Sequence, residues 1–180
     1  MNDLVESEDL AFGVGTCFAE QSMDRSSTSP PNHSSEYFMP ISARNQFNTV
    51  VSKIILGAVN AEIELITDGG SPIVAIITNE SINALGLAVG KKVIALVKAP
   101  WIIVVSGESP YLFSARNQLT GKVSKIGTGS VNSEITITLP GGTEIHSIIT
   151  NDSVSALGLN VGGTATALFK SSHVILAVAK

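Results

Sequence analysis

Two groups of hydrogen-bond donors recur in this chain at a constant separation of 72 residues. Each group combines hydroxyl side chains with cationic ones, and every member has a counterpart of the same type in the other group. The donors are Ser42, Arg44, Thr78, Ser81 and Lys98, and then Ser114, Arg116, Thr150, Ser153 and Lys170. Hydroxyl, guanidinium and ammonium groups all donate, so together they suit a small oxyanion, whose oxygens accept.

A short helix is expected to carry part of each group. The stretch "TNESINALGL" does not alternate between apolar and polar residues, Thr78 or Asn79 is a good N-cap, and Gly86 is a good C-terminal stop. Unpaired N–H groups in a first helical turn, together with the helix dipole, favour a negatively charged ligand. The hydroxyls of Thr78 and Ser81 therefore lie where an anion is favoured.

The chain contains a tandem repeat. The pentapeptide "SARNQ" occurs at 42–46 and again at 114–118, and 32 of the 64 aligned positions between 42–105 and 114–177 are identical. Identity at half of the positions without a gap indicates a duplicated domain. We divide the chain into a tail, two domains and a linker, at 1–40, 41–106, 114–180 and 107–113. The tail is acidic and serine-rich, and we expect it to be disordered.

Each repeat has the pattern of a small β-barrel. "AEIEL" and "SEITITL" alternate between apolar and polar residues, and "DGG" and "PGG" follow them as turn signals. Two β-branched runs close each copy, with a break at "KAP" in the first. The order is three strands, one short helix and two strands. The predicted fold class is therefore all-β with one short helix per repeat, as tandem OB-like five-stranded barrels.

Composition and charge exclude several classes of protein. The chain is 44% hydrophobic with a net charge of −4, of which residues 1–40 contribute −6 and the rest +2. That is too little positive charge for a nucleic-acid surface, and the longest apolar runs are only strand-sized, so we expect neither nucleic acid nor membrane as a partner. The single cysteine, Cys17, excludes an internal disulfide framework and fits a reducing, cytoplasmic location.

Catalytic groups are poorly represented. His33 lies in the tail, whereas His146 and His173 stand where the first copy has Val74 and Trp101. No spacing of cysteine and histidine resembles a zinc site, and no phosphate-binding loop of the "GxxxxGKS" type occurs. We therefore expect no catalytic residues, no bare metal cation and no enzymatic activity.

Taken singly, each donor has an ordinary structural explanation. Thr78 is a typical helix cap, Lys98 a solvated strand end and Arg44 a surface charge. Their joint return after 72 residues favours a site, although a duplication copies structural residues as well.

Several motifs closely resemble one known family. "SARNQ", "GAVNAEI", "ITNES" followed by "ALGL", and "KAPWIIV" resemble the Mop domains of molbindins and of the effector half of molybdate-dependent transcriptional regulators. The resemblance covers nearly all of 41–180 and looks like a di-Mop arrangement. It implies OB-like domains that assemble as trimers or hexamers of domains and bind molybdate or tungstate between neighbouring domains.

The resemblance also implies which residues bind the anion. In the first copy Ser42, Arg44, Lys98 and the backbone at Ala99 form one side of a pocket, and Thr78 and Ser81 reach in from a partner domain. The second copy supplies Ser114, Arg116, Lys170 and Ser171, with Thr150 and Ser153. A possible second anion site lies at the "VN" turns, at Val59, Asn60, Val131 and Asn132. "KAPW" becomes "KSSH" in the second copy, so we expect its pocket to differ in affinity.

Three functions remain open at this stage. The leading hypothesis is a cytoplasmic homo-oligomer, expected to be a trimer, that stores and buffers molybdate or tungstate. The alternative is a molybdate-sensing regulatory module whose state is read by a partner. An OB-fold nucleic-acid binder is disfavoured because only 5% of the residues are aromatic. A pocket that only donates should prefer molybdate to partly protonated phosphate, provided that Glu80 and Asp152 face solvent.

Overall fold

The computed structural model describes residues 41–107 and 109–179, so the expectation of a disordered tail at 1–40 lies outside the described residues. The first copy contains six elements before its last strand. They are β1 (Asn45–Leu56), β2 (Asn60–Thr67), β3 (Pro72–Thr78), α1 (Asn79–Leu85), β4 (Lys92–Val97) and the 3-10 turn η1 (Ala99–Trp101), followed by β5 (Ile103–Ser106). The second copy repeats this order as β6 (Asn117–Thr128), β7 (Asn132–Thr138), β8 (Glu144–Thr150), α2 (Asn151–Ala156), β9 (Thr164–Phe169), η2 (Ser171–His173) and β10 (Ile175–Ala177). The predicted order of strands and helix is confirmed.

The strands form where the sequence alternates. In β2 the buried positions Ala61, Ile63 and Leu65 occupy every second residue, so one face of the sheet lines the core. The "DGG" and "PGG" stretches are turns in which Gly70 and Gly142 have φ values of 78° and 83°. These positive φ values are sterically costly for residues with a Cβ atom, which explains the glycine at each turn.

Both short helices begin with a threonine cap. The Thr78 side chain accepts a hydrogen bond from the backbone N–H of Ser81, and α1 ends at Gly86 with φ 56° and ψ 45°. Thr150 caps α2 in the same way, through the N–H of Ser153. Of the two possible caps for α1, Thr78 is therefore the one used.

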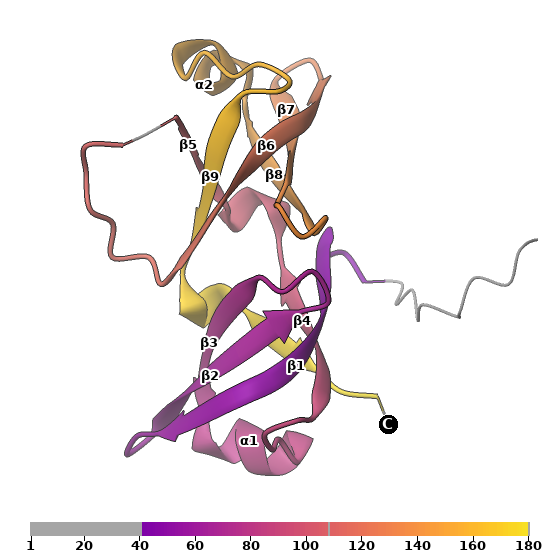
Figure 1. The fold of residues 1–180 in the computed structure, drawn as a ribbon, viewed down its shortest axis with the longest axis vertical. Coiled ribbons are helices and arrows are strands. Elements are labelled where there is room, and N and C mark those ends of the chain that lie inside the picture. Colours follow the sequence, from indigo (N-terminus) through magenta and orange to yellow (C-terminus); the bar gives the residue numbers. More distant parts are fainter. Residues whose placement is uncertain (1–40, 108, 180) are drawn as a thin grey trace, which may run out of the picture. The chain divides into compact units, whose positions relative to one another are not determined.

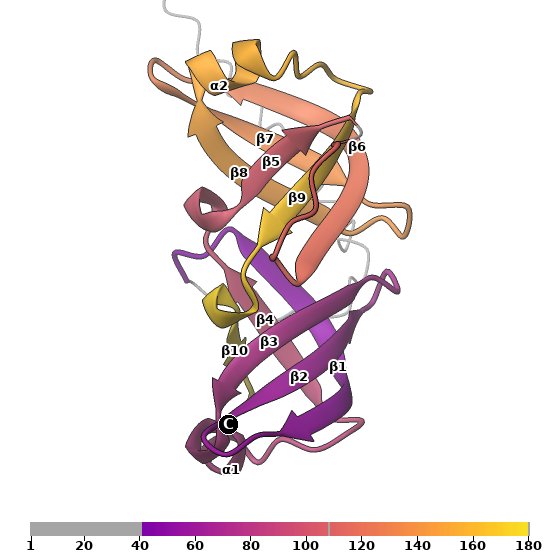
Figure 2. The ribbon, with the colours of Figure 1, turned by 90° about the vertical axis from the view of Figure 1, so that its left-hand side faces the viewer.

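The two barrels exchange their last strands (Figures 1 and 2). Strand β5, from the first copy, pairs with β9 of the second, whereas β10, from the second copy, pairs with β4 of the first. The two sheets have the orders β10-β4-β1-β2-β3 and β5-β9-β6-β7-β8. Each five-stranded barrel thus contains residues of both sequence repeats, so the repeat boundaries at 106 and 114 do not coincide with the barrels.

The short turn before each exchanged strand explains its direction. Lys98 and Ile102, on either side of η1, are both extended, with φ/ψ of −72°/134° and −97°/120°. The chain therefore continues away from β4 instead of folding back on it. The same conformation flanks η2, at Lys170 and Val174.

Asparagine side chains join the two barrels. Asn45 is 1% exposed, and its amide both accepts from the backbone N–H of His146 (2.7 Å) and donates to the His146 carbonyl (2.8 Å). Asn117 makes the equivalent pair of bonds to the backbone of Val74, at 2.7 and 2.8 Å. Val74 and His146 lie on β3 and β8, which are edge strands of the two sheets. Each amide therefore pairs with a backbone N–H and C=O that have no neighbouring strand to bond.

The turns of the two barrels also meet at glycines. A Cβ atom built on Gly141 would collide with the carbonyl oxygen of Gly69, and one on Gly69 would lie 2.6 Å from the carbonyl oxygen of Gly141. Thr67 and Thr143 approach each other beside this contact, with their hydroxyl oxygens 3.4 Å apart. The first glycine of each "GG" pair is therefore required by close packing and the second by φ.

Replacing Asn45 by alanine should destabilise the folded chain by roughly 2 to 4 kcal/mol, because two backbone groups of His146 lose their partner in a buried setting. Urea denaturation measures the loss. Asn48→Ala, at an exposed position of the same strand, is the matched control. Equal stability of the two variants would contradict the role given to the Asn45 amide.

A second prediction concerns Asn79, whose buried Oδ1 atom has no hydrogen-bond partner. In the second copy the equivalent Asn151 accepts from the Ser133 hydroxyl at 2.7 Å, whereas the first copy has Ala61 at that place. Ala61→Ser should therefore raise the free energy of unfolding by about 1 kcal/mol, and Ser133→Ala should lower it. A change of the same sign in both variants, measured by urea denaturation, would refute this account.

Candidate functional site

One group of predicted donors gathers where β1 begins and β4 ends. Asn45 pairs with Val97 across these strands, so their chain neighbours Arg44 and Lys98 lie side by side at the end of the ladder. Ser42, Arg44 and Lys98 are exposed, while Ala99 is only 1% exposed. The first copy thus presents two cations and a hydroxyl at one sheet end.

The second copy forms the same arrangement with one change. Asn117 pairs with Phe169, which brings Arg116 beside Lys170, and Ser114 is exposed. Ser171 replaces Ala99 and is 6% exposed. Its hydroxyl adds a polar atom that the first copy lacks.

Both arginines form ion pairs with the opposite barrel. Nη1 of Arg44 lies 3.0 Å from Oε1 of Glu134 on β7, and Nη2 of Arg116 lies 2.6 Å from Oε1 of Glu62 on β2. The two pairs are equivalent under the repeat, since both arginines and both glutamates are 72 residues apart. The guanidinium groups are therefore held by carboxylates.

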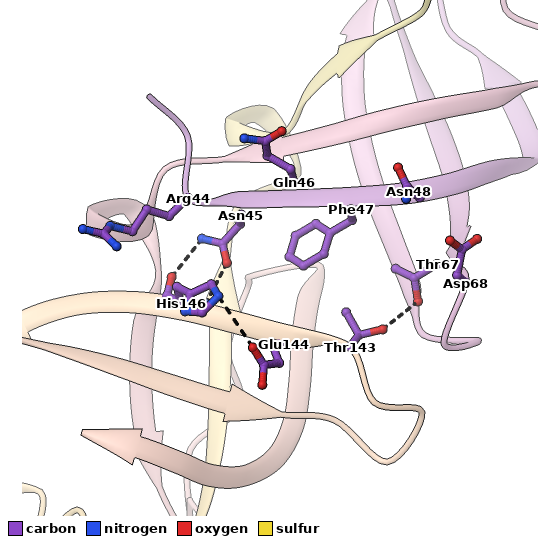
Figure 3. Close-up of a pocket in the computed structure, with 10 residues that line it drawn as sticks. All are labelled: Arg44, Asn45, Gln46, Phe47, Asn48, Thr67, Asp68, Thr143, Glu144 and His146. Atoms are coloured by element: carbon purple, nitrogen blue, oxygen red, sulfur yellow. Dashed lines mark hydrogen bonds and ion pairs between the residues drawn. The ribbon is translucent and has the colours of Figure 1, made fainter. Parts of the chain in front are cut away.

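The direction of Arg44 follows from its neighbour. Because Asn45 is fixed to the backbone of His146, the chain at residue 44 is held against β8 of the other barrel. Figure 3 shows Arg44 at the end of β1, beside Asn45 and His146. The buried amide thus positions the exposed cation.

The second group of donors lies at the helix caps. The hydroxyls of Thr78 and Ser81 are 2.9 Å apart, and those of Thr150 and Ser153 are 2.8 Å apart. Each threonine also accepts from the serine N–H at 3.1 Å. These hydroxyls already satisfy a structural role, and a ligand would have to bind at their remaining lone pairs and protons.

Glu80 and Asp152 lie in the first turns of α1 and α2 and are exposed, as predicted. The acidic side chains therefore point toward solvent beside the caps.

The two groups of one copy lie at opposite ends of their barrel. Arg44 precedes Asn45 at the start of β1, whereas Thr78 pairs with Asn60, next to the far end of β1 at Leu56. The 12 residues of β1 span a contour of roughly 36 Å between these ends. Among the described residues, neither arginine hydrogen-bonds a threonine or serine of either cap, so this chain by itself does not assemble the full predicted set.

Lys98 and Lys170 differ in their surroundings. The ammonium of Lys98 lies 5.9 Å from the ring centre of Trp101, within reach of a cation–π interaction. Trp101 in turn packs on His173, its counterpart in the second copy, with ring centres 5.2 Å apart. Among the described residues, a cation–π contact is thus found for Lys98 and not for Lys170.

The "VN" turns are exposed and structurally supported. Val59 and Val131 are 70% and 68% exposed, and their carbonyls accept from the N–H groups of Asn79 and Asn151, which begin the helices. Asn60 and Asn132 are also exposed. In this chain the turns contact the helix starts and lie far from the arginines of their own copy.

Two pockets lie beside Arg44. One, of about 270 Å³, is drawn in Figure 3, and the other, of about 540 Å³, also has Arg44 in its lining. Both pockets are lined by His146 and Glu144, whose Nε2 and Oε2 atoms are 4.0 Å apart. The described residues form no cluster of histidine, cysteine and acidic side chains suited to a metal ion.

No helix within the described ranges is long and apolar enough to span a membrane.

Sequence reasoning missed four residues that shape this site: Asn45, Asn117, Glu62 and Glu134. All four belong to the identical positions of the repeat, as the fourth residue of "SARNQ" and the glutamate of "VNAEI" and "VNSEI". Their identity in both copies was thus the feature of the sequence that could have drawn attention to them. A glutamate in an alternating strand is ordinarily solvated, however, and the periodicity does not reveal a partner in the other copy.

Comparison with known proteins gives consistent matches. Residues 41–104 and 114–176 each match the TOBE domain. The chain is 46% identical over 140 residues to the molybdenum-pterin-binding protein MopA of Rhodobacter capsulatus, covering 78% of this chain and 53% of the relative. It is also 46% identical over 140 residues to the molybdenum transport protein ModE of Azotobacter vinelandii, covering 78% and 52%. The chain spans about half the length of the curated relatives it matches.

Among solved structures, the chain is similar to the cytoplasmic molybdate-binding protein ModG with molybdate bound. The identity is 50%, the TM-score is 0.75, and the match covers 78% of this chain and 100% of that one. The tandem five-stranded architecture is thus shared with a solved protein along its whole length.

The caps allow the structural role of each hydroxyl to be separated from other roles. Thr78→Ala removes the acceptor for the Ser81 N–H and should cost about 1 kcal/mol of stability. Ser81→Ala keeps that N–H and should change stability by less than about 0.5 kcal/mol. Urea denaturation compares the two, and an equal loss in both variants would show that the cap depends on the serine hydroxyl as well.

Proposed function

The chain belongs to the family of tandem TOBE (Mop) domain proteins, and from that premise we propose that it binds molybdate or tungstate in the cytoplasm and stores and buffers the anion. ModG, to which it is 50% identical, is described as cytoplasmic and was solved with molybdate bound. The observation that carries the proposal is that this match covers the whole of ModG. In addition, the present chain places an arginine and a lysine side by side in each of its two copies.

The chemistry of the donors fits a tetrahedral dianion. Arg44 and Lys98 supply two positive charges at one end of the first sheet. Arg116 and Lys170 supply two at the equivalent end of the second sheet. A charged donor strengthens its hydrogen bond to an anionic oxygen roughly twofold over a neutral one. Serine hydroxyls at 42 and 114 and the backbone at 99 and 171 add neutral donors around the same place.

We propose that the binding pocket combines groups from different domains of an oligomer, most simply a trimer. The supporting observation is that Arg44 and Thr78 lie at opposite ends of one barrel, so that a pocket using both kinds of group needs another domain. Exposed apolar side chains at Leu56 (68%) and Val59 (70%) lie beside α1 and would be covered by such a partner.

The second candidate function is regulatory. ModE of Azotobacter vinelandii matches over 140 residues that make up about half of its length. A chain with the same tandem domains can report anion binding to a partner through a change in its own assembly. Storage and sensing would use the same binding site. A sensor must also bind its partner differently with and without the anion, whereas a storage protein need not.

Titration calorimetry with sodium molybdate tests the binding. Arg44→Ala and Arg116→Ala should each weaken one class of site by about 1.5 to 3 kcal/mol, since each removes a charged donor. Lys53→Ala, which removes a surface cation paired with Glu64, is the control and should leave affinity unchanged. Binding heat no greater than that of chloride in the native chain would reject the proposal.

Selectivity is tested in the same titration with phosphate as competitor. Phosphate retains a proton in part near pH 7, and the donors assigned to the pocket offer that proton no acceptor. Molybdate should therefore win at equal concentration. Displacement by comparable phosphate would show that an acceptor, with the glutamates near the arginines as the first candidates, takes part in the pocket.

Mixed oligomers test whether the pocket is shared between chains. An Arg44→Ala/Arg116→Ala chain and a Ser81→Ala/Ser153→Ala chain should each bind weakly alone and recover strong sites when co-assembled, because some pockets then combine intact halves. The serine variants keep the helix caps. If native mass spectrometry shows mixed oligomers but binding stays weak, the pocket lies within one chain.

A further inference from the structure

The ion pairs of the two arginines have a consequence for ligand binding. Arg44 and Arg116, the cations assigned to the anion, each contact a carboxylate of the opposite barrel, at 3.0 and 2.6 Å. Each contact joins one guanidinium nitrogen to one carboxylate oxygen, so the carboxylate offsets part of the positive charge that the arginine offers to a ligand and repels a second anion on the same group. The unliganded chain therefore supplies its own anion to each binding arginine.

We propose that Glu134 and Glu62 are built-in competitors, which the oxyanion must displace from Arg44 and Arg116, and which thereby set the affinity and the preference for dianions. This inference rests on the proposed function. It concerns two glutamates that are not among the proposed donors. The donors strengthen binding of the anion, whereas these carboxylates weaken it.

Geometry supports competition in preference to mere proximity. Both arginine side chains are more than half exposed, at 58% and 56%, so a ligand can reach the guanidinium from solvent. The glutamates are more enclosed, at 32% and 19%, and they project from β7 and β2 within the sheets. A carboxylate carried by a sheet strand beside an exposed cation acts as a tethered anion at high effective concentration.

Displacement favours a dianion on charge grounds. A monoanion such as chloride or nitrate gains no more charge–charge attraction from the arginine than the carboxylate already provides, and it must be present at high concentration to compete. A molybdate dianion brings twice the charge and four acceptor oxygens. The carboxylate thus suppresses weak anions more strongly than molybdate.

The two copies differ in how firmly the competitor is held. Glu62 has the shorter and more enclosed pair, with Arg116. Oε1 of Glu134 is shared, since it lies 3.7 Å from Nδ1 of His146 as well as 3.0 Å from Arg44, and the first copy has Val74 where His146 stands. Glu62 should therefore restrain its arginine more than Glu134 does.

Glutamate-to-glutamine variants test the proposal by titration with sodium molybdate. Each is measured in a background that keeps one class of site, so that E62Q is placed in R44A and E134Q in R116A. Molybdate affinity should rise about two- to fivefold, more for E62Q, and chloride and nitrate should compete more effectively than in the parent chain.

The matched control is E64Q. Glu64 lies on the same strand as Glu62 and pairs with Lys53 at 3.5 Å, so its loss changes net charge equally without freeing a binding arginine. E64Q should leave affinity unchanged. An equal gain in E64Q and E62Q would overturn the proposal, because net charge alone would then explain the effect.

Two further outcomes would also overturn it. Unchanged affinity in E62Q and E134Q would show that the carboxylates do not compete, and weaker binding would show that they position the arginines for the ligand. A fold check by circular dichroism accompanies each variant. As a second measurement, E62Q added to R116A should give no gain at the remaining sites, since its effect requires the arginine.

A failed proposed function gives a different result from a failed competitor. If the native chain binds no molybdate, the proposed function is wrong. If the native chain binds molybdate and the glutamine variants bind it no more tightly, only the proposed competition by the glutamates is wrong.

Discussion

The pairing of β10 with β4 and of β5 with β9 is the interaction on which the rest of the molecule depends. Each exchanged strand brings apolar side chains such as Val104 and Leu176 into the buried core, at 5% and 7% exposure. Removing either strand from the opposite barrel would expose that surface and leave a ladder unpaired. The two repeats are therefore one cooperative unit, and neither copy completes its own barrel.

The exchange also sets the surfaces that face one another. It holds β1 of one barrel against β8 of the other, where Asn45 bonds the His146 backbone, and it holds β6 against β3, where Asn117 bonds Val74. The arginines next to these asparagines consequently meet glutamates of the opposite copy. The packing of the barrels thus fixes the buried amide, and through it the carboxylate that each arginine of the proposed anion site contacts.

Duplication has left the two copies similar in backbone and different in chemistry. His146 faces Glu134 and Glu144 where the first copy has Val74, and Ser133 satisfies an asparagine oxygen that Ala61 leaves unpaired. Trp101 and His173, equivalent by the repeat, pack on each other between the barrels. The two proposed anion sites are therefore expected to differ in affinity, although both contain an arginine, a lysine, a threonine and serines at equivalent positions.

The sequence by itself determined the repeat, the order of strands and helix, a helix start at Thr78 or Asn79, and the turns at the "DGG" and "PGG" stretches. These features are local, since alternation, capping and positive φ depend on residues close together in the chain. Only the tertiary structure decided which barrel β5 and β10 join and which carboxylate each arginine meets. The two copies present nearly the same strand edges, so periodicity cannot distinguish pairing within a copy from pairing across copies. The extended backbone on both sides of η1 and η2, together with the fit of the two barrels, makes that choice.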